Sequence, residues 1–310
     1  MKAFTRILYP TDLSEASLAA ARFASAIARW YGSTLTVLHV VPTFAPTIAP
    51  DGLGGAGVII PAPTPEDTRK ETRRSVPADL LAGLDVHFDA LPGSPAAVIV
   101  DRAAADAAHL IVMGTHGRSG FSRLLAGSTT EKVLAHAPCP VLTIPPAASS
   151  LPAEATFSHV LCAVDYSPAS LSAMGLGLDL ARQAQGRASV VNTVEWLPDE
   201  EVRAHAHFNV AEFRQHLLAD ARARLHDALT DESRSWCDID ELVLVGRAHR
   251  EILRTAAERH CDLIAIGAQG SGAVVRALFG STTQQVVRGA NCPVLVVPGA
   301  PPAEPPPPAS

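Results

Sequence analysis

Hydrophobic and polar positions follow two alternating periods along the first half of the chain. Short apolar runs predict buried strands in RILYPTD, TLTVLHVVP, LDVHFDALPG, HLIVMG and CPVLTIP. Apolar residues at helical spacing predict helices in LSEASLAAARFASAIARWYG, SPAAVIVDRAAADAA and STTEKVLAHA. Strands that alternate with helices predict a mostly parallel sheet covered on both faces.

Local signals mark the ends of these helices. Ser14 is a plausible N-cap of the first helix, and Gly32 is a C-terminal stop signal. Pro95 is placed in the first turn of the next predicted helix, where its missing N–H costs nothing.

The whole pattern occurs twice. The second half reads HVLCAVD, LSAMGLGLDLARQAQG, ASVVNTVEW, DIDELVLVG, REILRTAAERH, DLIAIG, TTQQVVRGA and CPVLVVP. Between residues 110–145 and 263–298, 17 of 36 positions are identical at a constant offset of 153. An offset shared by whole halves indicates duplication of a domain rather than a short solenoid repeat.

The repeat defines the domain organisation. We expect a first domain at 1–147, a linker at 148–156, a second domain at 157–298 and a proline-rich disordered tail at 299–310. The stretch from Pro145 to His159 has the composition of an exposed linker.

The halves differ most after their second strand. The first has a Pro/Gly-rich loop from about Pro42 to Glu66, which is either a lid or partner surface or a mobile insertion. The second has a helical pattern from about Glu200 to Leu229.

Each half carries the glycine signature G-x2-G-x9-G-S, in Met113–Thr130 and in Ile266–Thr283. Each copy stands between a predicted strand and a predicted helix. Glycines let the backbone approach a phosphate, and a helix N-terminus presents free N–H groups to it. The signature therefore predicts a phosphate cradle in both halves, although it is not the Gly-Lys-Ser/Thr P-loop.

Basic side chains near the two cradles are unequal. Arg123 and Arg276 lie inside the nine-residue spacers and are either anion ligands or solvated surface charges. The first loop adds His116 and Arg118, where the second has Gln269 and Ser271, so the second offers less positive charge to a triphosphate. These six residues stand at equivalent positions in the two copies.

Asp12 and Asp165 end the first strand of each half, in YPTDLS and AVDYS. A carboxylate there can accept a hydrogen bond from a ribose or an adenine, or help to hold a metal. The alternative is a helix N-cap. Both aspartates and both glycine loops follow strand carboxyl ends, where ligands bind in open α/β sheets.

Charge and cysteine content exclude some classes of protein. The net charge of −6 argues against a nucleic-acid binder, and the acidity belongs to residues 151–310, with 13 Lys/Arg against 19 Asp/Glu. Five cysteines without a CxxC argue against a disulfide framework or zinc site and favour reduced thiols in a cytoplasmic protein. Neither a secretory signal nor a membrane span is visible.

Three other patterns have simpler explanations. GLGGAG at residues 52–57 lacks the strand and helix that a dinucleotide fingerprint needs. The two histidines His205 and His207 lack a clear third metal ligand. Cys139 and Cys292 precede the last strand of each half and are interpreted as buried apolar residues.

With these motifs, the chain resembles a tandem universal stress protein. The most specific stretches are MGTHGRSGFSRLLAGST and IGAQGSGAVVRALFGST, each followed by CPVL, together with PTDLS, AVDYS and LHVVP. The resemblance implies two five-stranded domains of flavodoxin-like or adenine-nucleotide α-hydrolase-like fold. Family members that bind ATP keep the glycine signature, and both copies keep it here.

The resemblance also implies site residues. Asp12, Val40 and Met113 would line an adenosine site, with Gly114, Gly117, Gly127, Ser128 and Thr129 at the phosphates. The second half would use Asp165, Val194, Ile266, Gly267, Gly270, Gly280, Ser281 and Thr282. Val194 is matched to Val40 through a one-residue shift between Gly32 and Gly186, and the pair Ala268-Gln269 departs from the first copy.

Family domains pair through their last strands. The resemblance therefore implies an intrachain pseudo-dimer through Val141–Ile144 and Val294–Val297, with further self-association possible. The expected function is that of a cytoplasmic ATP-binding regulator or sensor of the stress response, with Mg²⁺ accompanying the ATP. A slow ATP hydrolase or nucleotidyl transferase and a non-nucleotide interaction scaffold are the alternatives. No dedicated catalytic base or metal cluster is visible beyond Asp12 and Asp165.

Overall fold

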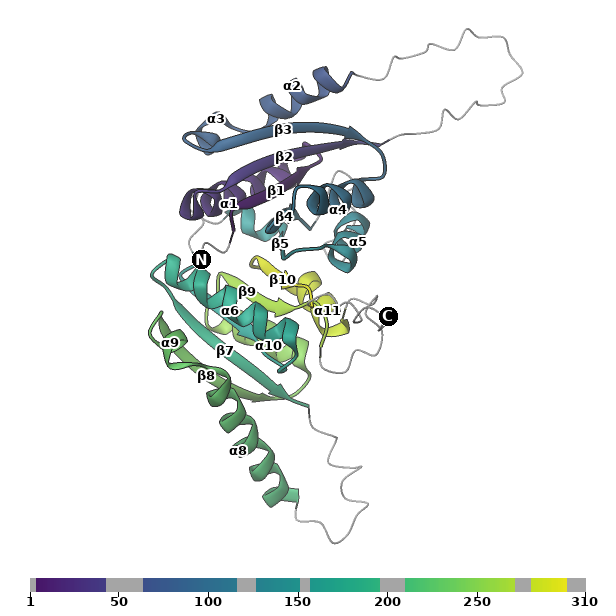
Figure 1. The fold of residues 1–310 in the computed structure, drawn as a ribbon. Helices are drawn as coiled ribbons and strands as arrows, with labels where there is room; N and C mark the ends of the chain where they lie inside the picture. The colour runs from purple at the N-terminus through teal and green to yellow at the C-terminus, as the bar shows by residue number, and fades with distance from the viewer. Residues whose placement is uncertain are drawn as a thin grey trace, which may run out of the picture. The chain divides into compact units, whose positions relative to one another are not determined.

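The computed structural model describes residues 4–42, 64–115, 127–150, 157–195, 210–270 and 280–299. The chain forms two compact units, Met1–Ala155 and Thr156–Ser310 (Figure 1). The division falls at the end of the stretch that the sequence predicts as the linker.

The first unit contains a parallel sheet in the order β3-β2-β1-β4-β5. Its elements are β1 (Arg6–Thr11), α1 (Glu15–Tyr31), β2 (Thr34–Val41), α2 (Pro65–Ser75), α3 (Ala78–Leu81), β3 (Asp85–Pro92), α4 (Pro95–Ala105), β4 (Leu110–Gly114), α5 (Ser128–His136), β5 (Val141–Ile144) and the 3₁₀ helix η1 (Pro146–Ser150).

The second unit repeats this topology with the sheet order β8-β7-β6-β9-β10. Its elements are β6 (His159–Ala163), α6 (Pro168–Gln183), β7 (Arg187–Val194), α8 (Val210–Ala228), α9 (Asp231–Arg234), β8 (Asp238–Val245), α10 (Ala248–Glu258), β9 (Leu263–Gly267), α11 (Ser281–Gly289) and β10 (Val294–Val297). The predicted fold of two tandem α/β domains is confirmed.

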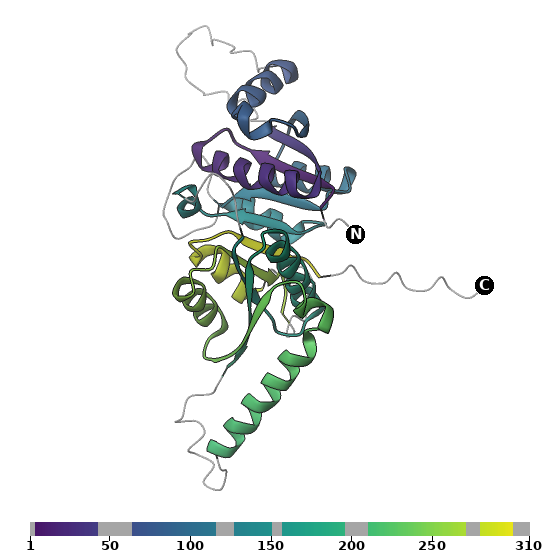
Figure 2. The ribbon, with the colours of Figure 1, turned by 90° about the vertical axis from the view of Figure 1, so that its left-hand side faces the viewer.

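Helices cover both faces of the first sheet. Helix α1 lies on one face against β1, β4 and β5, and the pair α4 and α5 lies on the other (Figures 1 and 2). In the second unit α6 packs on β6, β9 and β10, while α10 and α11 pack against each other. The central strands are buried on both sides, so Ile7, Leu8 and Tyr9 are at most 2% exposed.

The predicted ends of α1 are confirmed. The Ser14 side chain accepts a hydrogen bond from the Ser17 N–H at 3.2 Å, and Gly32 ends the helix in the left-handed conformation with φ 62°. Pro95 is the first residue of α4, as expected. The equivalent first residue of α10 is Ala248, whose N–H donates to Glu195 Oε1 at 3.2 Å.

Helices α2 and α9 were not predicted, because neither has an apolar stripe. The buried residues of α2 are Thr68 and Thr72, whose hydroxyls donate to backbone carbonyls one turn earlier at 3.0 and 2.8 Å. The helix begins with Thr64, which caps the Asp67 N–H, and with Pro65 at the first helical position. Capping residues were therefore the signal available for α2.

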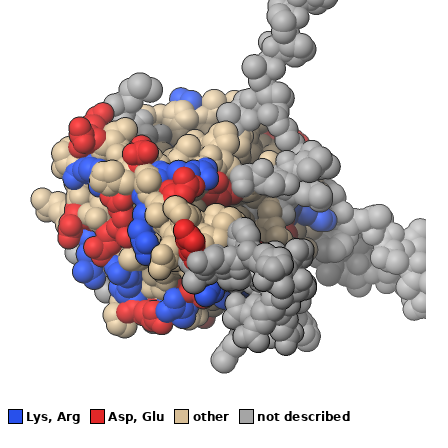
Figure 3. Space-filling model, turned by 90° about the horizontal axis from the view of Figure 1, so that it is seen from below, with Lys and Arg blue, Asp and Glu red and all other residues tan. Residues whose placement is uncertain are grey.

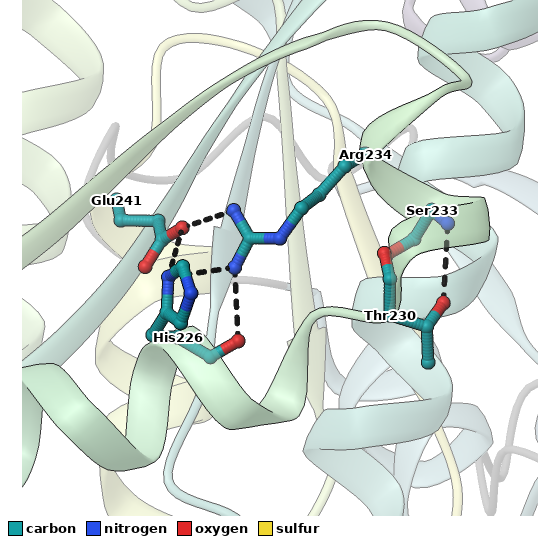
Figure 4. A network of polar contacts seen from close by, with 5 residues as sticks. All are labelled: His226, Thr230, Ser233, Arg234 and Glu241. Carbon is teal, nitrogen blue, oxygen red and sulfur yellow. Dashed lines mark hydrogen bonds and ion pairs between the residues drawn. The ribbon is translucent and has the colours of Figure 1, made fainter.

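The described part of helix α8 begins at Val210, and the predicted start near Glu200 lies outside the described residues. Its last turns are anchored by buried Ala221 and Leu225. Figure 4 shows how Arg234 of α9 completes the anchor. It donates to Glu241 of β8 and, at 2.9 Å, to the His226 carbonyl of α8.

The stretch predicted as an exposed linker is exposed only in part: Pro146, Ala147 and Ser158 are exposed, but other residues of the stretch are buried. Ala148 in η1 is 1% exposed, because η1 packs on α1. Phe157 is fully buried in the second unit. Residues 151–156 lie outside the described range.

The expected one-residue shift between the halves is wrong. Strand pairing joins Arg6 to Thr34 in the first unit and His159 to Arg187 in the second, so the offset of 153 holds across the second strand of each half. The residue equivalent to Val40 is therefore Thr193, and Val194 is equivalent to Val41.

Gly32 and Gly186, which suggested the shift, have different structural roles. The left-handed cap filled by Gly32 is filled in the second half by Gln185, with φ 51°. Gly186 is needed for close packing, since a Cβ there would lie 2.6 Å from the Ser158 carbonyl oxygen.

Charges of both signs are interspersed on the described part of the face that Figure 3 shows. The second unit contains ion pairs such as Arg259–Asp240 at 2.6 Å and Arg254–Glu258 at 2.8 Å. Among the described residues, none of the helices is both long and apolar enough to cross a membrane.

Candidate functional site

The predicted site residues lie at the carboxyl edge of each sheet. In the first unit β1 and β4 are neighbours, and the chain leaves them toward opposite sides of the sheet. Asp12 follows β1 and Gly114 ends β4. In the second unit Asp165 follows β6 and Gly267 ends the adjacent β9. This topological switch point is where doubly wound sheets bind ligands.

Each aspartate belongs to a tight turn that leads into a helix. The Ser14 N–H and hydroxyl donate to Asp12 Oδ1 at 3.1 and 2.5 Å. Ser167 makes the same two bonds to Asp165 Oδ1, at 3.1 and 2.6 Å. The N-caps are therefore the serines, and the alternative reading of the aspartates as caps is wrong.

The second unit brings Asp165 against the glycine loop. A Cβ at Gly270 would lie 2.7 Å from Asp165 Oδ2. Ser167 Oγ, whose proton is donated to Asp165, also lies 3.3 Å from the Gln269 carbonyl oxygen. Two parts of the predicted site, which are more than 100 residues apart in sequence, are thus in direct contact.

The glycines of the signature do not share one role. A Cβ at Gly267 would lie 2.8 Å from the Ser170 nitrogen and 3.0 Å from Ala169 atoms, so Gly267 allows α6 to pack on the end of β9. A Cβ at Gly127 would lie 3.3 Å from the Thr115 carbonyl oxygen, and a Cβ at Gly280 would lie 3.1 Å from the Ala268 carbonyl oxygen.

The helices that follow the glycine loops begin without a side-chain cap. Gly127 is the N-cap of α5 and Gly280 that of α11, and neither helix has a side-chain cap bond. Ser128 and Ser281 are exposed, and Thr129 and Thr282 are half-buried. Uncapped first-turn N–H groups, with hydroxyls beside them, are donors suited to an anion.

The third hydroxyl in each helix start holds the loop. Thr130 donates to the Gly114 carbonyl at 3.0 Å, and Thr283 donates to the Gly267 carbonyl at 2.7 Å. The Gly127 N–H donates to the Thr115 carbonyl at 2.7 Å, and the Gly280 N–H donates to the Ala268 carbonyl at 2.9 Å. These bonds join the two ends of each glycine loop. These two threonines were missed as site residues, although the repeat gives both of them at the offset of 153.

Three residues expected at the adenosine site are buried in the sheet. Val40, Met113 and Ile266 are 7%, 5% and 5% exposed. Their side chains face the core, so any contact with a ligand at this edge would come chiefly from their backbone.

Part of the predicted site lies outside the described residues. This part comprises His116, Gly117, Arg118, Arg123, Ser271 and Arg276. The sequences GLGGAG and His205–His207 also lie outside the described residues, as does most of the loop between Pro42 and Glu66.

Tyr166 links the second turn to α8. Its hydroxyl donates to the Ala221 carbonyl at 3.2 Å, and the Arg224 guanidinium lies 4.2 Å from its ring centroid. Burial raises the pKa of Tyr166, although nearby Arg224 opposes the shift. The first half has Leu13 at this position.

The thiols are free and protonated. Burial raises the pKa of Cys139 and of Cys292 to about 12. The predicted burial is confirmed for Cys139. Cys292 is only half-buried, so the predicted full burial is wrong for this residue. Among the described residues, no three His, Cys, Asp or Glu side chains gather as metal ligands.

Comparison with known proteins gives the same picture of two copies. The profile of the universal stress protein family matches residues 3–145 and 156–298. A universal stress protein of Mycolicibacterium smegmatis is 26% identical over 296 residues, which cover 94% of this chain and 96% of that protein. A Methanocaldococcus jannaschii member is 34% identical over 143 residues, which cover 46% of this chain and 82% of that protein.

A solved structure shows the same fold over nearly the full length. The crystal structure of a universal stress protein from Archaeoglobus fulgidus superposes with a TM-score of 0.65 at 21% identity, covering 95% of this chain and 98% of that one. Since the family profile matches nearly all of both halves, this chain is a tandem member of the universal stress protein family.

Proposed function

We propose that the chain is an ATP-binding universal stress protein that acts as a nucleotide-dependent regulator or sensor of the stress response. The observation that carries the proposal is the repeated helix start after the glycine loop. In both halves Gly-Ser-Thr leaves first-turn N–H groups uncapped, while the following threonine fixes the loop behind them. Such an arrangement binds phosphate through backbone donors and the helix dipole.

The residues around this helix start fit a nucleotide. The hydroxyls of Ser128 and Thr129, or of Ser281 and Thr282, have no hydrogen-bond partner among the described residues. Asp165 touches the glycine loop, so a ligand on the phosphate donors would lie near a carboxylate that can accept from a ribose hydroxyl. Magnesium would arrive with the ATP, because phosphate oxygens are its usual ligands.

The proposal includes a place and an assembly. It puts the protein in the cytoplasm, with the two halves paired through Val141–Ile144 and Val294–Val297. Each of these strands ends its own sheet on one side, and pairing would remove an unpaired edge from both. Slow hydrogen exchange at every amide of both strands is expected, and rapid exchange of alternate amides would contradict the pairing.

Calorimetric titration of nucleotide-stripped protein with ATP and magnesium tests the function. Asp12→Asn and Asp165→Asn are matched variants, because each keeps an acceptor oxygen for its serine. We expect a stoichiometry near two, with one site weakened in each variant. A stoichiometry near one would leave the other half as a partner domain without nucleotide. No binding at all would leave the interaction scaffold as the better proposal, and hydrolysis lost in Asp12→Asn would favour the slow hydrolase.

A further inference from the structure

Two different side chains make the same hydrogen bond in the two halves. His39 Nδ1 lies 2.7 Å from the Thr11 carbonyl oxygen, and Asn192 Nδ2 lies 2.8 Å from the Val164 carbonyl oxygen. Both pairs are related by the offset of 153. Since a carbonyl only accepts, both side chains act as donors.

These bonds lie where the pairing of the first strand with the second strand ends. In the first unit the last pair is Thr11 with His39, and in the second unit it is Ala163 with Val191. The carbonyl that accepts the bond belongs in each half to the residue directly before the aspartate, Thr11 before Asp12 and Val164 before Asp165. The side chain on the second strand therefore ties the backbone next to each aspartate to the neighbouring strand.

The turn held by these bonds is strained. Leu13 and Tyr166, which directly follow the aspartates, both have φ 64°. A non-glycine residue in this region costs about 1–2 kcal/mol, and such strain persists only where surrounding bonds enforce it. The serine bonds to the aspartates restrain the turn from the helix side. His39 and Asn192 restrain it from the second strand.

We propose that His39 and Asn192 are positioning residues that fix the direction of the Asp12 and Asp165 carboxylates for the ligand. The inference rests on the proposed nucleotide site. The duplication shows that the shape of the side chain is not what matters, because an imidazole and an amide serve equally as donors. Asparagine at position 39 is therefore a matched replacement, and leucine removes the donor at similar size.

The experiment uses the full chain with Asp165→Asn, so that ATP binding reports the first half. Magnesium ATP is titrated into this protein and into its His39→Leu and His39→Asn versions. Loss of one hydrogen bond that positions a charged ligand group predicts about tenfold weaker binding for leucine. Asparagine is expected to bind within about twofold of the parent, because it restores the donor.

A ligand-free measurement separates positioning from general stability. The Ser14 amide donates to Asp12, so its hydrogen exchange reports the turn directly. We expect faster exchange in His39→Leu and parent-like exchange in His39→Asn.

Three results would overturn the inference. They are a lower melting temperature in His39→Leu with unchanged ATP affinity, failure of asparagine to restore binding, and unchanged Ser14 exchange. Absence of ATP binding by the wild-type protein would remove the proposed function, and the Ser14 exchange would then still decide whether His39 holds the turn.

Discussion

Substituting two glycines of the second half should separate ligand binding from stability. Gly270→Ala puts a methyl group 2.7 Å from Asp165 Oδ2, which is the end of a side chain that can rotate away. Gly267→Ala puts one 2.8 Å from the Ser170 nitrogen, which belongs to the backbone of α6 and cannot move alone. The first change displaces a site residue, and the second displaces a helix.

The expected magnitudes differ accordingly. Overpacking at Gly267 should cost about 1–3 kcal/mol of unfolding free energy. In a domain of this size each kcal/mol lowers the melting temperature by about 2–4 °C. Gly270→Ala should stay within about 0.5 kcal/mol, because the added methyl group meets only side-chain atoms of Asp165 and no backbone atom. The effect of alanine on the unfolded chain is the same in both variants and cancels in the comparison.

For binding, the order is reversed. If Asp165 accepts a hydrogen bond from the ligand, its displacement by Gly270→Ala removes about 1.5–3 kcal/mol, or about 10-fold to 150-fold in affinity. Magnesium ATP titration in the Asp12→Asn background isolates the second site, and thermal unfolding measures stability. Parent-like affinity in Gly270→Ala would refute a role of Asp165 in binding. Equal melting temperatures for the two variants would refute the packing argument for Gly267.

Further predictions concern hydroxyls, a histidine and the thiols. Thr283→Val should lower the free energy of unfolding in urea by about 1–3 kcal/mol, because it leaves a carbonyl unsatisfied. Thr282→Val should weaken ATP binding without changing the urea midpoint. The opposite pattern would contradict the roles assigned to these two threonines. Burial lowers the pKa of His159 from 6.5, so the folded state binds its proton less tightly than the unfolded state does. Stability should therefore fall as the pH drops below about 6.5, and the fall should be smaller in His159→Gln; an equal fall in that variant would refute the assignment. Burial raises the pKa of Cys139 to about 12 and of Cys261 to about 11. Iodoacetamide at pH 8 should therefore label these thiols at least about 100-fold more slowly in the native protein than in the urea-unfolded protein. Similar labelling rates, measured by mass spectrometry, would exclude buried thiols.

The sequence was sufficient for the fold because the repeat and the apolar periods agree. Every predicted strand is present, and the offset of 153 applies to strand pairing as well as to motifs. Helix α2 was not predicted, because its buried face consists of Thr68 and Thr72 rather than apolar residues. Periodicity of hydrophobic residues cannot detect a helix that buries threonines.

Within the site, residue types predicted location better than role. Gly267 and Gly270 belong to one motif, yet one contacts a helix backbone and the other a carboxylate. Gly186 suggested a shift in the alignment of the halves because a glycine was expected at the left-handed cap, which Gln185 occupies instead. His39 and Asn192 share no chemical class, so only their equivalent hydrogen bonds reveal a common role.

The first N–H group of a helix has no partner within the helix, and α4 and α10 deal with it differently. The difference decides where foreign sequence can be inserted. Pro95 has no N–H, so the first residue of α4 needs no acceptor beyond the end of β2. Ala248 depends on Glu195, one residue beyond β7. A peptide tag or reporter grafted directly after β2 would remove no hydrogen bond from the first residue of α4. The same graft after β7 would pull the Glu195 carboxylate from α10, so the first half is the more permissive host for foreign sequence.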